Sequence, residues 1–175
     1  MNDRAERMKR YWCIGGIALV LAPLDQLTKH LAEGALPLRP ARVVIDGFFN
    51  LVRVQNRGAA FGFLNNNASD LQFWFFALAT VLAVAGVLYL AGTLPLRAYA
   101  AFCCLGLILG GALGNFIDRC RLGHVRDFLD FYWGEWHWPA FNVADIGITL
   151  GVFGFIALTL AQRSKDKNKC SPAGK

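Results

Sequence analysis

Ionisable side chains stand at the ends of apolar segments in the second half of this chain. An ionised group at the centre of a membrane helix is unfavourable by about 2.5–3.5 kcal/mol, so a chain that keeps several of them usually uses them. Three are aspartates, Asp118, Asp127 and Asp145, and a pair of these could perform acid/base chemistry. The polar residues that accompany the aspartates are Asn115, Arg119 and Asn142.

Two carboxylates in a poorly hydrated site titrate as a pair, because the second ionises less easily beside the first. One then acts as a base that activates water, and the other, still protonated, polarises a scissile carbonyl. This is the chemistry of aspartic peptidases, and it needs neither a metal nor a cofactor. A helix N-terminus favours Asp145 as the anion, while an apolar sequence setting favours Asp127 as the protonated partner.

Asp118 is the ambiguous acid. It lies closer in sequence to Asn115 than Asp127 does, and on the residues alone it competes with Asp127 for the catalytic role. Its neighbour Arg119 predicts a salt bridge that would keep Asp118 ionised in a supporting role, and the residues alone leave both roles open.

Several of these residues also have a purely structural interpretation. Asn142 and Asp145 have the spacing of a capping box at the start of a helix. Asp25 and Lys29, one turn apart, could form a plain ion pair on a helix. What favours function is that separate segments place polar groups at the same level.

The elements that position these residues are four apolar segments. The chain has 175 residues, of which 55% are hydrophobic and 17% charged, an unusual balance for a soluble domain. About 20 helical residues span the roughly 30 Å of a bilayer core. We expect an all-α polytopic membrane protein with one domain over 1–162 and a polar, disordered cytoplasmic tail over 163–175. Its four spans are predicted at about 12–31, 71–92, 98–117 and 143–161.

Basic residues precede the first span and follow the fourth, which predicts that both termini are cytoplasmic. The end of the third span and the start of the fourth then face outward. The net charge of +6 does not indicate a nucleic-acid partner, because the basic residues are divided between two tails with no recognition module between them.

The outer segments predict a small β-sheet element and a membrane-interface segment. Residues 43–45 and 48–54 flank an Asp46-Gly47 turn and read as a β-hairpin. The segment before Asn142 is rich in Trp, Tyr and Phe, which predicts an aromatic interfacial segment.

Small residues predict close helix packing. Gly106, Gly110 and Gly114 recur every four residues in the third span, and Gly147 and Gly151 do so in the fourth. Such spacing predicts that the third and fourth spans pack closely, which brings the end of one beside the start of the other.

Two other classes of function compete with a peptidase. A proton or ion carrier would use Asp25, Asp127 and Asp145 as relay sites, but it would spread its acids through the depth of the membrane. A metal site would combine the aspartates with His124 or His137, whose spacing fits no close ligand pattern.

Five stretches closely resemble the lipoprotein signal peptidases of bacteria (signal peptidase II), in order and over nearly the whole chain. They are Asp25 with Lys29, Asn-Arg-Gly-Ala-Ala-Phe-Gly at 56–62, Gly-Gly-Ala-Leu-Gly-Asn-Phe-Ile-Asp-Arg at 110–119, Val-Arg-Asp-Phe at 125–128 and Phe-Asn-Val-Ala-Asp at 141–145. The resemblance implies a metal-free aspartic endopeptidase of the cell inner membrane. It implies Asp127 and Asp145 as the catalytic pair, with an active site towards the periplasmic face.

The resemblance also implies the substrate and the supporting residues. The substrates are prolipoproteins, cut just before a cysteine that carries a diacylglyceryl group, and the only other partners are membrane lipids. We expect the protein to function as a monomer without cofactors. The supporting residues are Asp25, Lys29, Asn56, Gly58, Asn115, Asp118, Arg119 and Asn142.

Overall fold

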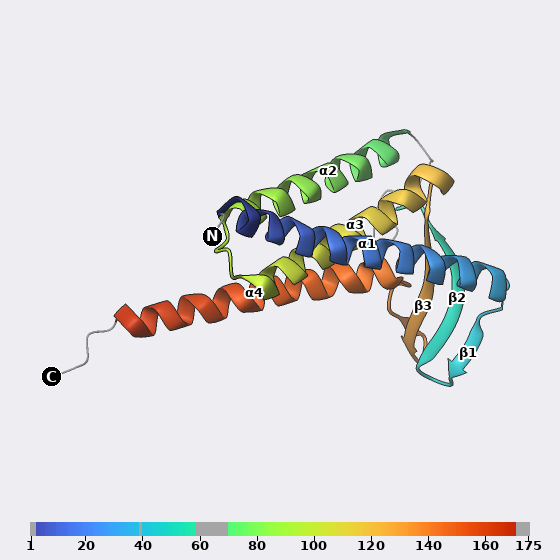
Figure 1. Ribbon diagram of the computed structural model, residues 1–175. Helices are drawn as coiled ribbons and strands as arrows, with labels where there is room; N and C mark the ends of the chain where they lie inside the picture. Colours follow the sequence, from blue (N-terminus) through green and yellow to red (C-terminus); the bar gives the residue numbers. More distant parts are fainter. Residues whose placement is uncertain (1–2, 39, 59–69, 171–175) are drawn as a thin grey trace.

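The computed structural model describes residues 3–38, 40–58 and 70–170. Within these ranges four helices are long and apolar enough to cross a membrane, and each contains one predicted span. They are α1 (Asp3–Ala35), α2 (Asp70–Thr93), α3 (Tyr99–Leu122) and α4 (Val143–Cys170). Figure 1 shows the four helices side by side, with a small β-sheet across one end of the bundle and the N-terminus near the other. We call these the sheet end and the terminal end.

Helix α4 is longer than the sequence predicted. The prediction of a disordered tail from 163 onward is wrong for residues 163–170, because α4 continues to Cys170. Lysine, arginine and glutamine have good helix propensity, so a helix that is already formed by apolar packing can extend beyond it. Residues 171–175 lie outside the described residues.

Helix α3 packs against α1 through the predicted glycine stripe. A Cβ atom at Gly106 would lie 2.8 Å from the Cβ of Ile17, and one at Gly110 would lie 2.9 Å from the Cβ of Leu21. The prediction that this stripe brings α3 to α4 is therefore wrong. One residue further along a helix turns by about 100°, so the α4 contact falls to the neighbouring position, Gly111.

Close contact between α3 and α4 depends on other glycines. A Cβ at Gly111 would overlap the carbonyl oxygen of Ala144. A Cβ at Gly151 would lie 2.7 Å from both the carbonyl oxygen of Cys104 and the Cγ1 of Ile108. Close packing of the third and fourth spans is thus confirmed, with a different contact face on α3.

A buried arginine fastens α2 at the terminal end. Arg10 of α1 donates hydrogen bonds to the carbonyl oxygens of Ala91 and, at 3.1 Å, of Gly92. These carbonyls belong to the last turn of α2, where helical partners run out. Arg10 therefore satisfies groups that would otherwise remain unpaired.

The β-sheet has four antiparallel strands in the order β1-β2-β3-β4. The predicted hairpin is confirmed, and it forms the first two strands of the sheet. The other two strands fall in the segment predicted as an aromatic interfacial segment, because aromatic residues favour strands as well as membrane interfaces. The strands are β1 (Arg42–Ile45), β2 (Phe49–Asn56), β3 (Val125–Trp133) and β4 (Trp136–His137).

Strand β3 links the sheet to two helices. Gly123 ends α3 with φ 72°, a left-handed conformation suited to glycine, and β3 begins at Val125. Further along, the amide of Leu129 donates to the carbonyl of Phe141 at 3.0 Å, just before α4. The chain therefore leaves α3, runs through β3 and enters α4 at the same end of the bundle.

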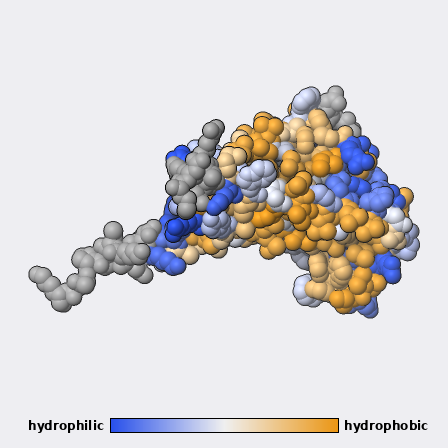
Figure 2. Space-filling model, in the orientation of Figure 1, coloured by the Kyte–Doolittle hydropathy of each residue, from blue (hydrophilic) through white to orange (hydrophobic). Residues whose placement is uncertain are grey.

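The outer surface of the bundle is apolar. Figure 2 shows hydrophobic residues over the helices and hydrophilic residues gathered towards both ends. Helix α2 exposes large apolar side chains along its length, as expected for a lipid-facing helix. They include Leu71, Trp74, Leu78, Leu82 and Tyr89.

We expect Gly111→Ala to lower the melting temperature of the detergent-solubilised protein. Alanine is intrinsically better than glycine in a helix by about 1 kcal/mol, so any loss reports the overlap with α4. Overpacking of this kind typically destabilises by about 1–3 kcal/mol. Gly86→Ala in α2 is the matched control, since a Cβ there meets nothing within 4 Å. Equal melting temperatures for the two variants would contradict the packing described for α3 and α4.

Candidate active site

A buried lysine organises the sheet end of the bundle. The Lys29 side chain is 1% exposed, and its Nζ lies 2.7 Å from Oδ2 of Asp25 and 3.2 Å from Oδ2 of Asp118. It also donates to Oδ1 of Asn115 at 2.9 Å. The predicted pair of Asp25 and Lys29 is confirmed, and it is one part of a larger network that joins α1 to α3.

Asp25 extends this network to α4. Its Oδ1 accepts a hydrogen bond from the backbone amide of Ala144 at 2.9 Å. This amide lies in the first turn of α4, where backbone donors lack helical partners. The approach requires Gly114 on α3, because a Cβ there would lie 2.6 Å from Oδ2 of Asp25.

Asp118 connects the same network to the sheet. The Arg126 side chain donates to Oδ1 of Asp118 at 2.7 Å, and the Arg126 backbone amide donates to Oδ2 at 3.0 Å. Gln26 of α1 donates to Oδ1 at 2.9 Å. Asp118 is fully buried and thus fixes the first residues of β3 against α1 and α3.

The predicted salt bridge between Asp118 and Arg119 is wrong. Adjacent helical residues point about 100° apart, so the Arg119 side chain leaves the network that holds Asp118. Its guanidinium lies 3.8 Å from the ring centroid of Phe76 on α2, a cation–π contact. Arg119 therefore ties α2 to the site, and the ion-pair partners of Asp118 are Lys29 and Arg126.

Asp127 lies on β3, where two amides hold its carboxylate. Asn56 of β2 donates to Oδ2 at 2.9 Å, and Asn142 donates to Oδ1 at 2.6 Å. Val54 pairs with Asp127 across the sheet, and Asn56, two residues along, lies on the same face. The strand register therefore brings Asn56 to Asp127.

The pKa of Asp127 is raised from its ordinary value of 3.8 to about 6. Burial is the largest cause, and the negative charge of Asp145 adds to it. The hydrogen bonds from Asn56 and Asn142 act in the opposite direction, because they stabilise the carboxylate. Burial and the second acid outweigh the two amides.

Asp145 lies in the first turn of α4. The predicted capping box is confirmed. The backbone amide of Asp145 donates to Oδ1 of Asn142 at 3.1 Å, and the backbone amide of Asn142 donates to Oδ2 of Asp145 at 3.2 Å. Asn115 of α3 donates to Oδ1 of Asp145 at 2.8 Å. The carboxylate of Asp145 thus accepts hydrogen bonds from α3 and from the first turn of α4.

Asn142 and Asn115 connect the two acids. The side-chain nitrogen Nδ2 of Asn142 donates to Asp127 and also to Oδ1 of Asn115, at 3.2 Å. Asn115 in turn donates to Asp145. Asn142 is fully buried. The arrangement is a closed set of hydrogen bonds that links the carboxylates of Asp127 and Asp145.

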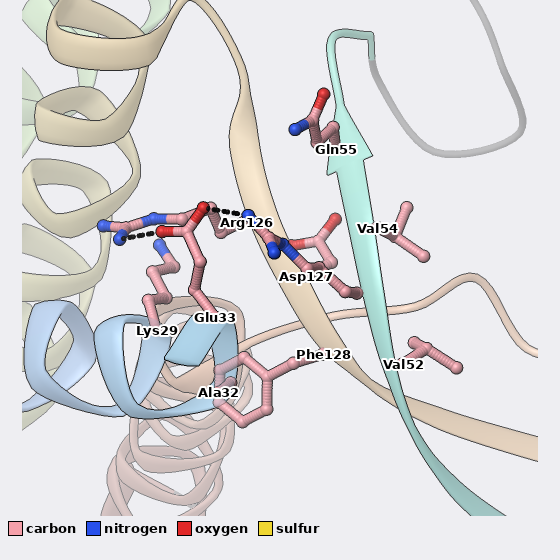
Figure 3. A pocket seen from close by; sticks show the side chains of 10 residues that line it. Lys29, Ala32, Glu33, Val52, Val54, Gln55, Arg126, Asp127 and Phe128 are labelled. Carbon is pink, nitrogen blue, oxygen red and sulfur yellow. Dashed lines mark hydrogen bonds and ion pairs between the residues drawn. The ribbon is translucent and has the colours of Figure 1, made fainter. Parts of the chain in front are cut away.

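The α1 side of Asp127 is closed. Figure 3 shows Lys29, Glu33 and Phe128 around a small cavity that Asp127 also lines. Its volume of about 10 Å³ is the room needed for one water molecule. Glu33 of α1 forms ion pairs with Arg126 and Arg53, at 3.2 and 2.6 Å, and so holds both β2 and β3 against α1.

The structure does not bring every residue considered from the sequence to the site. Gly58 is buried, but residues 59–62 of its motif lie outside the described residues. Among the described residues, no group of three histidines, cysteines or acids could hold a metal ion. His137 lies instead beside Asp130, at 3.0 Å.

Three residues of the supporting network, Gln26, Glu33 and Arg126, were not predicted from the sequence. Gln26 and Glu33 share a helix face with Lys29, so a polar stripe on the last turns of the first span was visible in the sequence. Arg126 adjoins Asp127 in the Val-Arg-Asp-Phe stretch at 125–128. Its partners lie in distant segments, so no spacing in the sequence indicated these contacts.

Known proteins with similar sequences and structures point to one family. A family model described as signal peptidase (SPase) II matches residues 17–161. A lipoprotein signal peptidase of Nitratidesulfovibrio vulgaris is 53% identical over 152 residues, covering 85% of this chain and 90% of the relative. One from Oleidesulfovibrio alaskensis is 47% identical over 151 residues, covering 86% and 96%. A solved structure of a bacterial membrane enzyme matches with a TM-score of 0.73 at 31% identity, over 91% of this chain and 92% of that one.

Four membrane-spanning helices with an acidic pair at one end define a polytopic membrane peptidase of the aspartic class. The chain belongs to the signal peptidase II family.

We predict that Asp127 makes the stability of the protein depend on pH. Because its folded-state pKa of about 6 exceeds the ordinary value of 3.8, the stabilisation is complete below about pH 4 and is lost as the pH rises through 6. The loss amounts to about 3 kcal/mol. Melting temperatures of the wild type should therefore fall between pH 4 and pH 7, and those of Asp127→Asn should fall less.

Asp46→Asn, in the exposed β1–β2 turn, is the control and should follow the wild type. If the wild type and Asp127→Asn depend on pH in the same way, the raised pKa of Asp127 is contradicted.

Proposed function

We propose that this protein is an endopeptidase that removes the signal peptide from diacylglyceryl-modified prolipoproteins. The cut falls on the N-terminal side of the lipid-bearing cysteine. One observation carries the proposal: two carboxylates, Asp127 and Asp145, are linked through Asn142 and Asn115, and Asp127 has a pKa raised to about 6. Family membership supplies the substrate, since relatives of this chain are lipoprotein signal peptidases.

In the proposed mechanism the two acids have opposite roles. Ionised Asp145 accepts a proton from a water molecule while the water oxygen attacks the scissile carbonyl carbon. Protonated Asp127 donates a hydrogen bond to the carbonyl oxygen and then its proton, giving a neutral tetrahedral intermediate. As the C–N bond breaks, the proton held by Asp145 passes to the leaving nitrogen, and the intermediate returns a proton to Asp127. The products are a signal peptide with a new carboxyl group and a lipoprotein whose N-terminus is the lipidated cysteine.

The substrate must approach on the side away from α1. The cavity between Asp127 and α1 has room for a single water, and Arg53, Glu33 and Arg126 close it with ion pairs. Asp145 instead borders an open apolar groove on α4. A substrate that approaches Asp145 from this side reaches it without breaking the ion-pair network.

We further propose a topology in which both termini are cytoplasmic and the sheet end faces the periplasm. Lysine and arginine gather in the first turns of α1 and after the apolar part of α4, as the positive-inside rule requires. One chain supplies both aspartates and both asparagines, so the site needs no second copy.

The clustering of acids favours this function over an ion carrier. The acidic residues of the membrane-spanning segments are Asp25, Glu33, Asp118 and Asp145. All lie near the sheet end, in the network around Lys29 and Arg126 or next to it. A relay through the membrane would need acids at several depths.

We predict that Asp127→Asn and Asp145→Asn each lower kcat for a diacylglyceryl-modified prolipoprotein by about 1,000-fold or more, because each variant removes one proton-transfer group. Cleavage is measured with purified protein in detergent micelles, and EDTA should leave the wild-type rate unchanged. Asp46→Asn is the matched acid-to-amide control and should retain wild-type activity. Wild-type rates for either catalytic variant would refute the assignment of the pair.

The pH profile of cleavage tests the protonation states. Because protonated Asp127 is required, kcat/KM should decline as the pH rises above about 6. Asn56 donates to the Asp127 carboxylate and thereby lowers its pKa, so Asn56→Ala should raise the pKa and move the alkaline limb to higher pH. A limb that stays in place, or moves to lower pH, contradicts the proposed acid role of Asp127.

A further inference from the structure

A groove of about 320 Å³ opens beside Asp145 on the surface of α4. Among the described residues that line it, Asp145 is the only ionisable one. The volume falls at the lower end of the range for ligand-binding clefts, about 300–1,000 Å³. The other residues of the lining are Trp138, Phe141, Ile146, Thr149 and Leu150.

The groove runs from the carboxylate into the depth of the membrane-spanning segment. The membrane-spanning part of α4 is Val143–Lys165, so Leu150 lies two turns inside it. Ile146 is 38% exposed and Leu150 is 61% exposed, and both belong to the membrane-spanning part of α4, where exposed side chains are expected to meet lipid. An occupant of this groove is therefore apolar along its length and ends next to Asp145.

We propose that this groove holds a fatty acyl chain of the substrate's diacylglyceryl group during cleavage, an inference that rests on the function proposed above. The lipid-bearing cysteine adjoins the scissile bond, so its acyl chains begin within a few bonds of the catalytic carboxylates. From there a chain that enters the hydrocarbon layer along α4 contacts Ile146 and then Leu150.

The dimensions of the groove favour an acyl chain over the apolar helix of a signal peptide. From Asp145 to Leu150 the α4 wall is about 7.5 Å long, less than two helical turns. A peptide helix is about 10–12 Å wide and needs about 30 Å to cross the bilayer, so it would extend far beyond these contacts. A single hydrocarbon chain is narrower than a peptide helix and can lie along a groove with a wall of this length.

The test compares two synthetic prolipoprotein peptides that differ only in acyl length, one S-dipalmitoylglyceryl and one S-dihexanoylglyceryl. Leu150→Trp fills the deep end of the groove and lies more than a turn from Asp145. We expect it to lower kcat/KM about tenfold for the dipalmitoyl peptide and less than about twofold for the dihexanoyl peptide. Leu160→Trp is the control, because Leu160 is 59% exposed on the same helix but outside the groove. It should change neither value.

Two results would overturn the proposal while the peptidase function stands. An equal loss for both peptides would assign the groove to the peptide portion of the substrate. If Leu150→Trp lowers kcat/KM for neither peptide, the substrate does not occupy the groove, and bilayer lipids would fill it instead. If the wild type cleaves neither peptide, the proposed function fails instead.

A binding measurement keeps the inference testable apart from cleavage. Asp127→Asn protein should bind the dipalmitoyl peptide more tightly than the dihexanoyl peptide, and adding Leu150→Trp should abolish most of that preference. Equal affinities for the two peptides, or a preference that survives Leu150→Trp, would overturn the acyl-chain assignment.

Discussion

Lys29 carries a charge in a setting where the surrounding lipid offers no water to solvate it. A buried charge is tolerated only when partners compensate it, and removing one partner of such a pair typically destabilises by about 3–5 kcal/mol. The partners of Lys29 are Asp25 on its own helix and Asp118 on α3. Because Asp25 also binds an amide of α4, and Asp118 binds Arg126 on β3, one ion-pair network sets the relative positions of three helices and the sheet.

The same network orients the amides that hold Asp127 and Asp145, the proposed catalytic acids. Lysine is only a donor, so Asn115 must present its oxygen to Lys29 and therefore its nitrogen to Asp145. Asn142 likewise gives its oxygen to the backbone amide of Asp145, which leaves its nitrogen for Asp127. Each asparagine is thus held in one orientation, because the group that contacts its oxygen can only donate a hydrogen bond. The carboxylates receive donors in a defined geometry, and burial raises the pKa of Asp127.

The sequence predicted the features whose causes are local. The capping box of Asn142 and Asp145, the Asp25–Lys29 pair and the first hairpin each follow from spacing within a few residues. Features that depend on which helix face meets which neighbour were not predictable. The stripe that begins at Gly106 packs on α1 rather than α4, and Asp118 pairs with Arg126 rather than with Arg119. Strand β3 was missed because its aromatic residues fit a membrane interface equally well, and the assignment of Asp127 over Asp118 came from the family resemblance.

The central claim is that Asp127 retains its proton above the pH range in which aspartates ordinarily ionise. Infrared difference spectroscopy of the protein in nanodiscs, titrated between acid and neutral pH, measures protonated carboxyl groups directly. We expect a carboxyl band that disappears with a pKa of about 6 and is absent in Asp127→Asn. The claim would be contradicted if no carboxyl band titrated near pH 6, or if the band that does so remained in Asp127→Asn.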